Sequence, residues 1–253
     1  MNQGALFHFA LEASAYVVAA VMYRFTSLRR SIDSVPFPQN GFQKLAIVAA
    51  AVFGAAMGAR LLYLLDYWHA LQVQPVEVWF SGKTIVGGLL GGLVAVEIAK
   101  KLVDWPQSTG DRFVPSLLIG MIIGRVGCQF AGLEDLTYGG ATSLPWGWNY
   151  GDGVPRHPVA IYEIVGLLTI GVVLIVFRRR LIAPGDRFKL FLTSYLGLRL
   201  GLDCLKPPFT TPAAHMLAPT SYAGLSAIQW ACVAGLIYYL WSIKLKASAS
   251  RTK

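Results

Sequence analysis

Three arginines of this sequence lie inside long apolar stretches, where a charged side chain is energetically expensive. They are Arg60, Arg125 and Arg199, and Asp203 follows Arg199 by four positions. A charge at the centre of a membrane-spanning helix costs roughly 3 kcal/mol or more. Charged residues in such stretches are therefore candidates for a binding or catalytic role.

The chemistry that several arginines favour is the binding of an anion. A guanidinium group presents a planar fork of N–H donors that matches phosphate, and the apolar setting favours a ligand with a hydrophobic tail. A phospholipid, with its phosphate headgroup and acyl tails, meets both conditions. A structural alternative stays open, because Arg199 and Asp203 have the spacing at which side chains on one helix face pair, and such pairs can fix helix packing.

The composition predicts a membrane protein. Of the 253 residues, 55% are hydrophobic and 14% are charged, whereas soluble domains have about 25% charged residues. A membrane-spanning helix needs about twenty residues. Apolar stretches on this scale, the third shorter and rich in glycine, cover residues 5–23, 45–65, 85–98, 113–130, 159–177, 188–205 and 222–241. Because no long polar linker interrupts them, we predict one all-α integral membrane domain of residues 1–253, a bundle of about seven transmembrane helices.

Basic residues predict the orientation of these helices, because cytoplasmic loops of membrane proteins are enriched in lysine and arginine. The segments after the first, third, fifth and seventh stretches are basic, whereas the alternate loops hold only Lys83, Arg156 and Lys206. We predict a membrane protein with its N-terminus outside and its C-terminus in the cytoplasm. The net charge of +9 then reflects topology, and nucleic acid is not expected as a partner.

This orientation places the polar residues of the apolar stretches in the outer half of the membrane. Arg60 and Arg125 are late in outward-running helices, and His8 and Glu12 lie in the outer half of the first helix. We therefore predict a lipid cavity on the outer side of the bundle, beside the loop 131–158. The three cysteines show no metal-binding or redox spacing, so we expect neither a metal nor a cofactor.

Glycines recur in the second and third apolar stretches. Gly54 and Gly58 form one GxxxG pattern, and the run from Gly87 to Gly92 contains two more. This spacing lets helix backbones approach closely in lipid. A second interpretation is that Gly87 and Gly88 clear space for a lipid headgroup at the outer end of the third stretch.

Motifs in the second half of the chain resemble those of prolipoprotein diacylglyceryl transferases. Residues 124–132 read GRVGCQFAG, which is similar to that family's GRxGNFxNG. Residues 138–147 read YGGATSLPWG, similar to WGRPT…PWG, and residues 155–163 read PRHPVAIYE, similar to RHPxQLYE.

The resemblance continues into the sixth apolar stretch. Tyr195, Arg199 and Asp203 match the family's Y…R…E pattern, and the whole resemblance covers roughly residues 45–206. It implies transfer of a diacylglyceryl group from phosphatidylglycerol to the cysteine thiol of a prolipoprotein, with loss of glycerol phosphate, on the outer face of the inner membrane. The prolipoprotein would then be the second partner.

The resemblance also implies roles for individual residues. The expected catalytic residues are Arg125, Arg199, His157, Glu12 and Asp203. The expected substrate-binding residues are Arg60, Gly87, Gly88, Gly139, Tyr162, Glu163 and Lys206. The two catalytic arginines would stabilise the phosphate that leaves. His157 has two interpretations, a general base near neutral pH or a side chain that orients the loop through a hydrogen bond.

The chain departs from the family pattern at several polar positions. Val86 stands where the family has the histidine of HGG, and Cys128 stands where it has the asparagine of GRxGN. Glu12 aligns with a family tyrosine, and Glu134 and Asp135 are displaced from the family's glutamate. Two alternatives follow: a related transferase with a different acceptor, or a membrane protein that binds phospholipid without catalysis.

Overall fold

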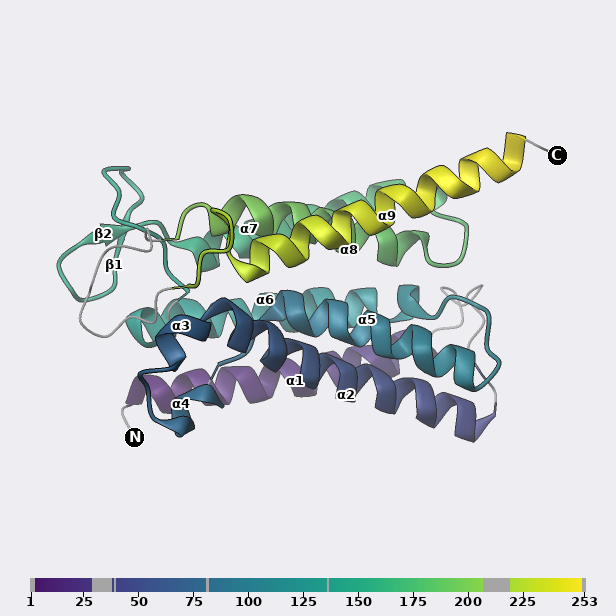
Figure 1. Ribbon diagram of the computed structural model, residues 1–253, viewed down its shortest axis with the longest axis horizontal. Coiled ribbons are helices and arrows are strands. Elements are labelled where there is room, and N and C mark those ends of the chain that lie inside the picture. Colours follow the sequence, from purple (N-terminus) through teal and green to yellow (C-terminus); the bar gives the residue numbers. More distant parts are fainter. Residues whose placement is uncertain are drawn as a thin grey trace. The chain divides into compact units, whose positions relative to one another are not determined.

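The computed structural model describes residues 3–28, 38, 40–80, 82–135, 137–206 and 219–251, which are mainly helical (Figure 1). The long helices are α1 (Gln3–Leu28), α2 (Gly41–Asp66), α5 (Ile85–Leu102), α6 (Val114–Ala131), α7 (Val159–Val176), α8 (Asp186–Asp203) and α9 (Ala227–Arg251). Each predicted apolar stretch lies largely or wholly on one of these helices.

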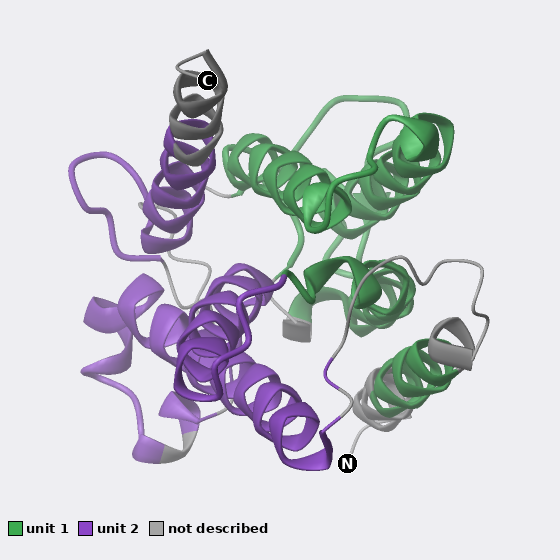
Figure 2. Ribbon diagram, turned by 90° about the vertical axis from the view of Figure 1, so that its right-hand side faces the viewer, with its two compact units in different colours: residues 1–36, 108–208 green, residues 37–107, 209–253 purple. Residues whose placement is uncertain are grey.

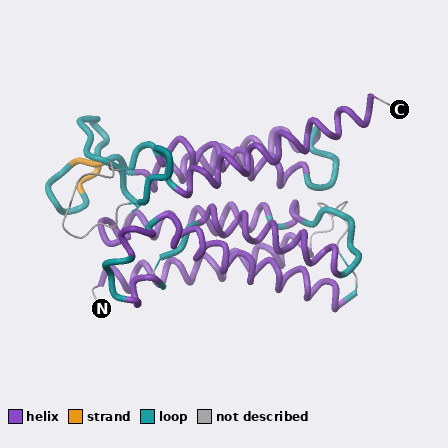
Figure 3. Tube along the Cα trace, viewed as in Figure 1, coloured by secondary structure: helices purple, strands orange, loops and turns teal. Residues whose placement is uncertain are grey.

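Short elements connect the long helices. They are α3 (Trp68–Leu71), α4 (Val76–Trp79), the 3-10 turns η2 (Gly110–Arg112), η3 (Gly132–Asp135) and η4 (Phe177–Arg179), and the strands β1 (Trp148–Asn149) and β2 (Pro155–Arg156). The strands pair antiparallel, with Trp148 opposite Arg156. Figure 3 shows them as a small hairpin within a long loop of an otherwise helical chain.

Within the described part of the chain, three helical segments are long and apolar enough to cross a membrane: α2, α6, and α7 with its η4 extension to Arg179. The apolar part of α9, Ala227–Trp241, is shorter. Charged side chains make α8 more polar, because Asp186, Arg187, Lys189, Arg199 and Asp203 all belong to it.

The first compact unit, green in Figure 2, contains α1, α6, α7 and α8. Within it, α6 packs against both α1 and α7, and α8 packs against α7. Leu167 of α7 and Phe191, Leu192 and Leu196 of α8 are fully buried. In contrast, Val165, Leu168, Val172 and Ile175 of α7 are exposed, as expected for a helix with one side facing lipid.

A buried aspartate fixes the start of α8. Asp111 accepts hydrogen bonds from the backbone N–H of Gly185 at 2.7 Å and of Phe188 at 2.8 Å. The first N–H groups of a helix have no partner within the helix. Asp111 supplies such a partner from the segment before α6, and it thereby sets the start of the helix that carries Arg199.

The second unit, purple in Figure 2, contains α2, α3, α4, α5 and α9. Its centre is the crossing of α2 and α5, where the predicted GxxxG patterns meet. A Cβ on Gly54 would collide with Gly91 and Ala95, and a Cβ on Gly58 would collide with the carbonyl oxygen of Gly87. The packing interpretation of these glycines is therefore confirmed for Gly87. The prediction of one domain over residues 1–253 stays a prediction.

The last long helix begins at Ala227, five residues after the start of the predicted stretch at Tyr222. Ser226 and Gln229 form a reciprocal cap, in which the Gln229 N–H donates to Ser226 Oγ at 3.1 Å and the Ser226 N–H donates to Gln229 Oε1 at 2.8 Å. Asp66 of α2 accepts from the Ile228 N–H at 3.1 Å. Together these contacts fix where α9 starts.

The substitution Gly58→Ala is expected to destabilise the second unit. The new Cβ would collide with Gly87 and lie 2.8 Å from the Cα of Gly91, so α2 and α5 would have to separate. We expect a loss of about 1–3 kcal/mol in the free energy of unfolding, as for other overpacked sites. Thermal unfolding of the purified protein in detergent measures this loss.

Gly88→Ala is the matched control, because its nearest neighbour, the Ala55 carbonyl oxygen, would lie at an ordinary 3.6 Å. Equal loss of stability in Gly58→Ala and Gly88→Ala would contradict the packing argument. Since Gly88 is also a predicted lipid contact, the comparison concerns stability alone.

Candidate functional site

One face of α8 carries three polar side chains at intervals of one helical turn. Tyr195, Arg199 and Asp203 are spaced four residues apart, which places them on the same side of a helix, and all three are buried. The predicted pairing within this face is confirmed, because Arg199 Nη2 donates to Asp203 Oδ1 at 3.1 Å.

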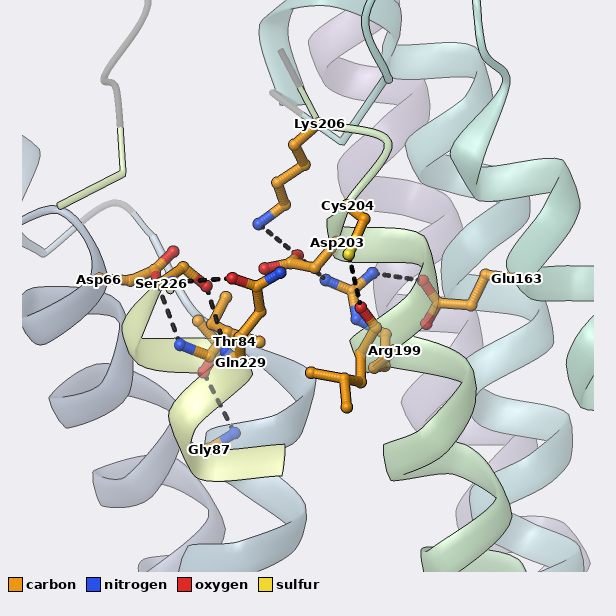
Figure 4. Close-up of polar contacts among 12 residues, drawn as sticks. Asp66, Thr84, Gly87, Glu163, Arg199, Asp203, Cys204, Lys206, Ser226 and Gln229 are labelled. Atoms are coloured by element: carbon orange, nitrogen blue, oxygen red, sulfur yellow. Dashed lines mark hydrogen bonds and ion pairs between the residues drawn. The ribbon is translucent and has the colours of Figure 1, made fainter. Parts of the chain in front are cut away.

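Glu163 of α7 is the centre of the site. Its side chain is fully buried. Its Oε2 accepts from Arg199 Nη1 at 2.9 Å (Figure 4), and its Oε1 accepts from the Tyr195 hydroxyl at 2.7 Å. Arg125 of α6 forms an ion pair with the same Oε1, with its Nε at 3.0 Å. The carboxylate of Glu163 on α7 thus links side chains of α6 and α8.

The network also includes a lysine. Lys206 extends it beyond the end of α8, with its Nζ 2.7 Å from Asp203 Oδ1 (Figure 4). Among the described residues the network contains three cationic groups, Arg125, Arg199 and Lys206, and two carboxylates, Glu163 and Asp203. Arg125 and Arg199 are buried, whereas Lys206 is only partly buried. Guanidinium and ammonium donors gathered in this way suit an anionic ligand.

Arg125 makes a second contact within its own helix. Its Nη1 lies 3.5 Å from the sulfur of Cys128, one turn further along α6. Sulfur is a weak acceptor compared with an amide oxygen. The residue that replaces the family's asparagine therefore still faces the arginine, but it holds the arginine less strongly.

A second group of predicted residues lies in the loop before α7 and at its start. The ring nitrogen Nδ1 of His157 is 3.3 Å from the Tyr162 hydroxyl, and that hydroxyl accepts from Trp146 Nε1 at 2.9 Å. Gly139 lies directly behind His157, because a Cβ on this glycine would come within 2.6 Å of the His157 Cβ. Gly139 is therefore required for the close approach of two backbones.

The same loop is stabilised at the hairpin. Arg156 donates to Asp152 Oδ2 at 2.7 Å and lies over the ring of Tyr138. The hydrogen bond from Arg156 lowers the pKa of the Asp152 carboxyl, whereas burial raises the pKa of the Tyr138 hydroxyl. Asp152 is exposed to solvent, so its ion pair contributes little to stability.

Three predicted lipid contacts lie in the second unit and are not part of the network around Glu163. Arg60 of α2 donates to the carbonyl oxygen of Gly82 at 3.1 Å. Gly87 packs against Gly58, and its N–H donates to the Thr84 hydroxyl at 3.2 Å at the start of α5. Gly88 has only ordinary contacts with α2. The predicted substrate contacts of Arg60, Gly87 and Gly88 stay predictions.

The side chains of His8 and Glu12 lie outside the part of the chain whose side chains the structure describes, as do those of Glu134 and Asp135. Val86 is described, and only 1% of its surface is exposed. The position of the family's histidine is thus filled here by an apolar residue that packs in the interior of the second unit.

Sequence reasoning missed two members of these clusters. Tyr195 was assigned no role, although its position one turn before Arg199 places it on the same helix face. Trp146 belongs to the second motif, and nothing in the sequence predicts its hydrogen bond to Tyr162, sixteen residues away.

Long apolar helices and a buried network that contains two arginines define this chain as a helical membrane protein with a site suited to an anion. The model of the family described as prolipoprotein diacylglyceryl transferase matches residues 7–244. The chain therefore belongs to the prolipoprotein diacylglyceryl transferase family, whose members are transferases of the bacterial inner membrane.

Individual relatives agree with this assignment. The chain is 29% identical to the phosphatidylglycerol–prolipoprotein diacylglyceryl transferase of Methylibium petroleiphilum over 245 residues, which are 90% of this chain and 89% of the relative. It is 30% identical to the enzyme of the same name from Polynucleobacter asymbioticus, over 78% of this chain and 74% of the relative. The corresponding enzyme of Cupriavidus necator is 29% identical, over 81% of this chain and 76% of the relative.

Replacement of Glu163 by glutamine is expected to destabilise the protein. Arg125 and Arg199 would lose their shared counter-ion while remaining buried, and breaking a buried ion pair in this way costs about 3–5 kcal/mol. Tyr195→Phe is the matched variant, because it removes only the hydroxyl from the same carboxylate and should cost about 1–3 kcal/mol. Thermal or denaturant unfolding in detergent compares the two. Unchanged unfolding of Glu163→Gln would mean that the arginines do not depend on this carboxylate.

Proposed function

We propose that this protein transfers a diacylglyceryl group from phosphatidylglycerol to the cysteine thiol of a prolipoprotein, releasing glycerol phosphate. The observation that carries the proposal is the buried network around Glu163, which brings together Arg125 and Arg199 from two helices and is extended by the partly buried Lys206. The names of the relatives support the choice of both substrates.

The reaction is a substitution at carbon. The thiolate sulfur forms a bond to the terminal glyceryl carbon, the bond from that carbon to the phosphate oxygen breaks, and glycerol phosphate leaves with the electron pair. The thiol proton passes to water before or during the attack. The barrier falls if positive groups stabilise the charge on the leaving phosphate, which is the role we assign to Arg125 and Arg199.

Both arginines can bind phosphate while Glu163 holds them. A guanidinium group has more N–H donors than the two that Arg199 uses for Glu163 and Asp203. The carboxylate separates the two positive groups electrostatically and orients them, so their placement does not have to wait for the lipid. Lys206 and Asp203 form the part of the network nearest to the loop that follows α8.

We further propose that α1, α2, α5, α6, α7, α8 and α9 all cross the inner membrane. In this topology the N-terminus is outside, the C-terminus is cytoplasmic, and a lipid cavity opens toward the outer side. The distribution of basic residues supports this orientation, because Lys100 and Lys101 lie in the last turn of α5 and Arg178–Arg180 follow α7. Few basic residues follow the alternate helices.

The orientation can be tested with single cysteines. In a variant that lacks the native cysteines, a new cysteine at Ser143, in the loop before β1, should react with a membrane-impermeant maleimide added from the periplasmic side. A cysteine at Ser108, between α5 and α6, should react only after the membrane is permeabilised. The opposite labelling pattern would overturn both the orientation and the outer-side position of the site.

The activity can be tested with purified protein, phosphatidylglycerol and a peptide that contains a lipobox cysteine. We expect release of glycerol phosphate together with the mass increase of a diacylglyceryl thioether on the peptide. Arg125→Ala and Arg199→Ala should each lower the rate about 100-fold or more. Lysine at either position should restore only part of the rate, because it lacks the bidentate fork of a guanidinium.

Arg179→Ala is the matched control, since Arg179 is an exposed arginine of η4 and the reaction should not depend on it. Full activity in both Arg125→Ala and Arg199→Ala would refute the phosphate site. Release of glycerol phosphate without peptide modification would indicate a different acceptor, and lipid binding without any release would indicate a protein that does not catalyse transfer.

A further inference from the structure

Hydrogen bonds link three side chains in series: Trp146, Tyr162 and His157. Trp146 Nε1 lies 2.9 Å from the Tyr162 hydroxyl oxygen, and the same oxygen lies 3.3 Å from Nδ1 of His157. The rings of His157 and Tyr162 meet edge to face, with their centroids 6.1 Å apart. The Tyr162 hydroxyl group therefore contacts both a tryptophan and a histidine.

The direction of the two hydrogen bonds follows from the chemistry of the groups. An indole N–H can only donate, so the Tyr162 oxygen accepts from Trp146. The hydroxyl proton of Tyr162 then needs an acceptor, and Nδ1 of His157 is the acceptor recorded for it within the described part of the chain. If Nδ1 carried a proton instead, the Tyr162 oxygen would face two donors and its own proton would have no protein acceptor there.

The backbone of His157 is fixed in place on both sides. Its N–H donates to the Gly140 carbonyl at 3.0 Å, and its carbonyl accepts from the N–H of Gly139 and of Val159, each at 2.9 Å. These backbone hydrogen bonds fix the position of the His157 Cα, so the imidazole ring can move only by rotation about the side-chain bonds. The hydrogen bond at Nδ1 limits that rotation.

We infer that neutral His157 carries its proton on Nε2 and acts as a hydrogen-bond donor to an oxygen of the bound lipid, and that Tyr162 and Trp146 are positioning residues that select this tautomer. The role toward lipid rests on the proposed function. It decides between the two interpretations of His157 that the sequence left open. A histidine whose Nδ1 lone pair is occupied by Tyr162 and whose Nε2 is protonated has no free lone pair to take the thiol proton.

The tautomer can be observed directly by nitrogen-15 NMR of the protein in detergent with labelled histidine. The chain has four histidines, and His157→Gln identifies the signals of His157. At a pH where the imidazole is neutral, we expect the Nε2–H form to dominate in the wild type. Tyr162→Phe removes the hydroxyl and should convert the signal to a mixture of tautomers. Trp146→Phe should do the same in part.

Trp148→Phe is the matched control, because Trp148 is an exposed tryptophan of β1 two residues from Trp146, and it should leave the His157 signals unchanged. Two results would overturn the inference: a dominant Nδ1–H form in the wild type, or a tautomer that does not respond to Tyr162→Phe. Neither NMR result depends on turnover of lipid. The tautomer assignment can therefore fail while the proposed transferase activity is observed, and the activity can fail while the tautomer assignment holds.

Rates of lipid turnover distinguish a hydrogen-bond donor from a base. The glutamine of His157→Gln retains an N–H donor, so it should keep about ten times more activity than His157→Ala. A general base typically contributes about 100-fold or more, and glutamine cannot replace it. Equal, deep losses in His157→Gln and His157→Ala, with both proteins folded, would restore the base role and reject the donor role.

Discussion

The contact on which the site depends is the one that Glu163 makes with two arginines at once. Arg125 and Arg199 come from different helices, and without a common anion they would repel each other in a medium of low dielectric constant. The fully buried carboxylate forms ion pairs with both arginines and accepts a hydrogen bond from Tyr195, and it thereby holds α6, α7 and α8 in one arrangement. A buried carboxylate is itself unfavourable, so each member of the network stabilises the others, and the removal of any one affects all of them.

The rest of the first unit serves to place this network. On α7 the apolar residues Val172 and Ile175 are exposed while Glu163 is fully buried, the reverse of the arrangement in a soluble protein. Lipid on the outside accounts for this reversal, because it allows apolar groups to face outward and requires charges to find partners inside. At the far end of α8, Asp111 caps the helix and so fixes its start. A rigid frame of this kind presents charged groups to a ligand without further rearrangement.

Much of this architecture follows from the sequence, and the part that does not is tertiary. The length of the apolar stretches predicts the helices, and the spacing of Arg199 and Asp203 predicts their pairing. Two partners of Glu163, Arg199 and Tyr195, lie 36 and 32 residues further along the chain. No local sequence pattern therefore shows that one carboxylate joins them. The start of α9 was placed too early for the same reason, because one of its caps is Asp66, 162 residues before Ile228. The family motifs identify which residues matter, but they do not reveal which contacts those residues make.

The departures from the family pattern affect the handling of protons more than the holding of phosphate. Val86 is an interior packing residue, and Cys128 contacts Arg125 through a weak acceptor, whereas the ion pairs of Glu163 with both arginines are present. In the proposed reaction, the cationic groups would favour a thiolate as well as a phosphate, since cationic surroundings lower the pKa of a thiol from its usual value of about 8.5. The same network would then promote both halves of the substitution. A site of this kind depends less on a dedicated base, which is why the loss of the family's histidine is compatible with transfer to a thiol acceptor.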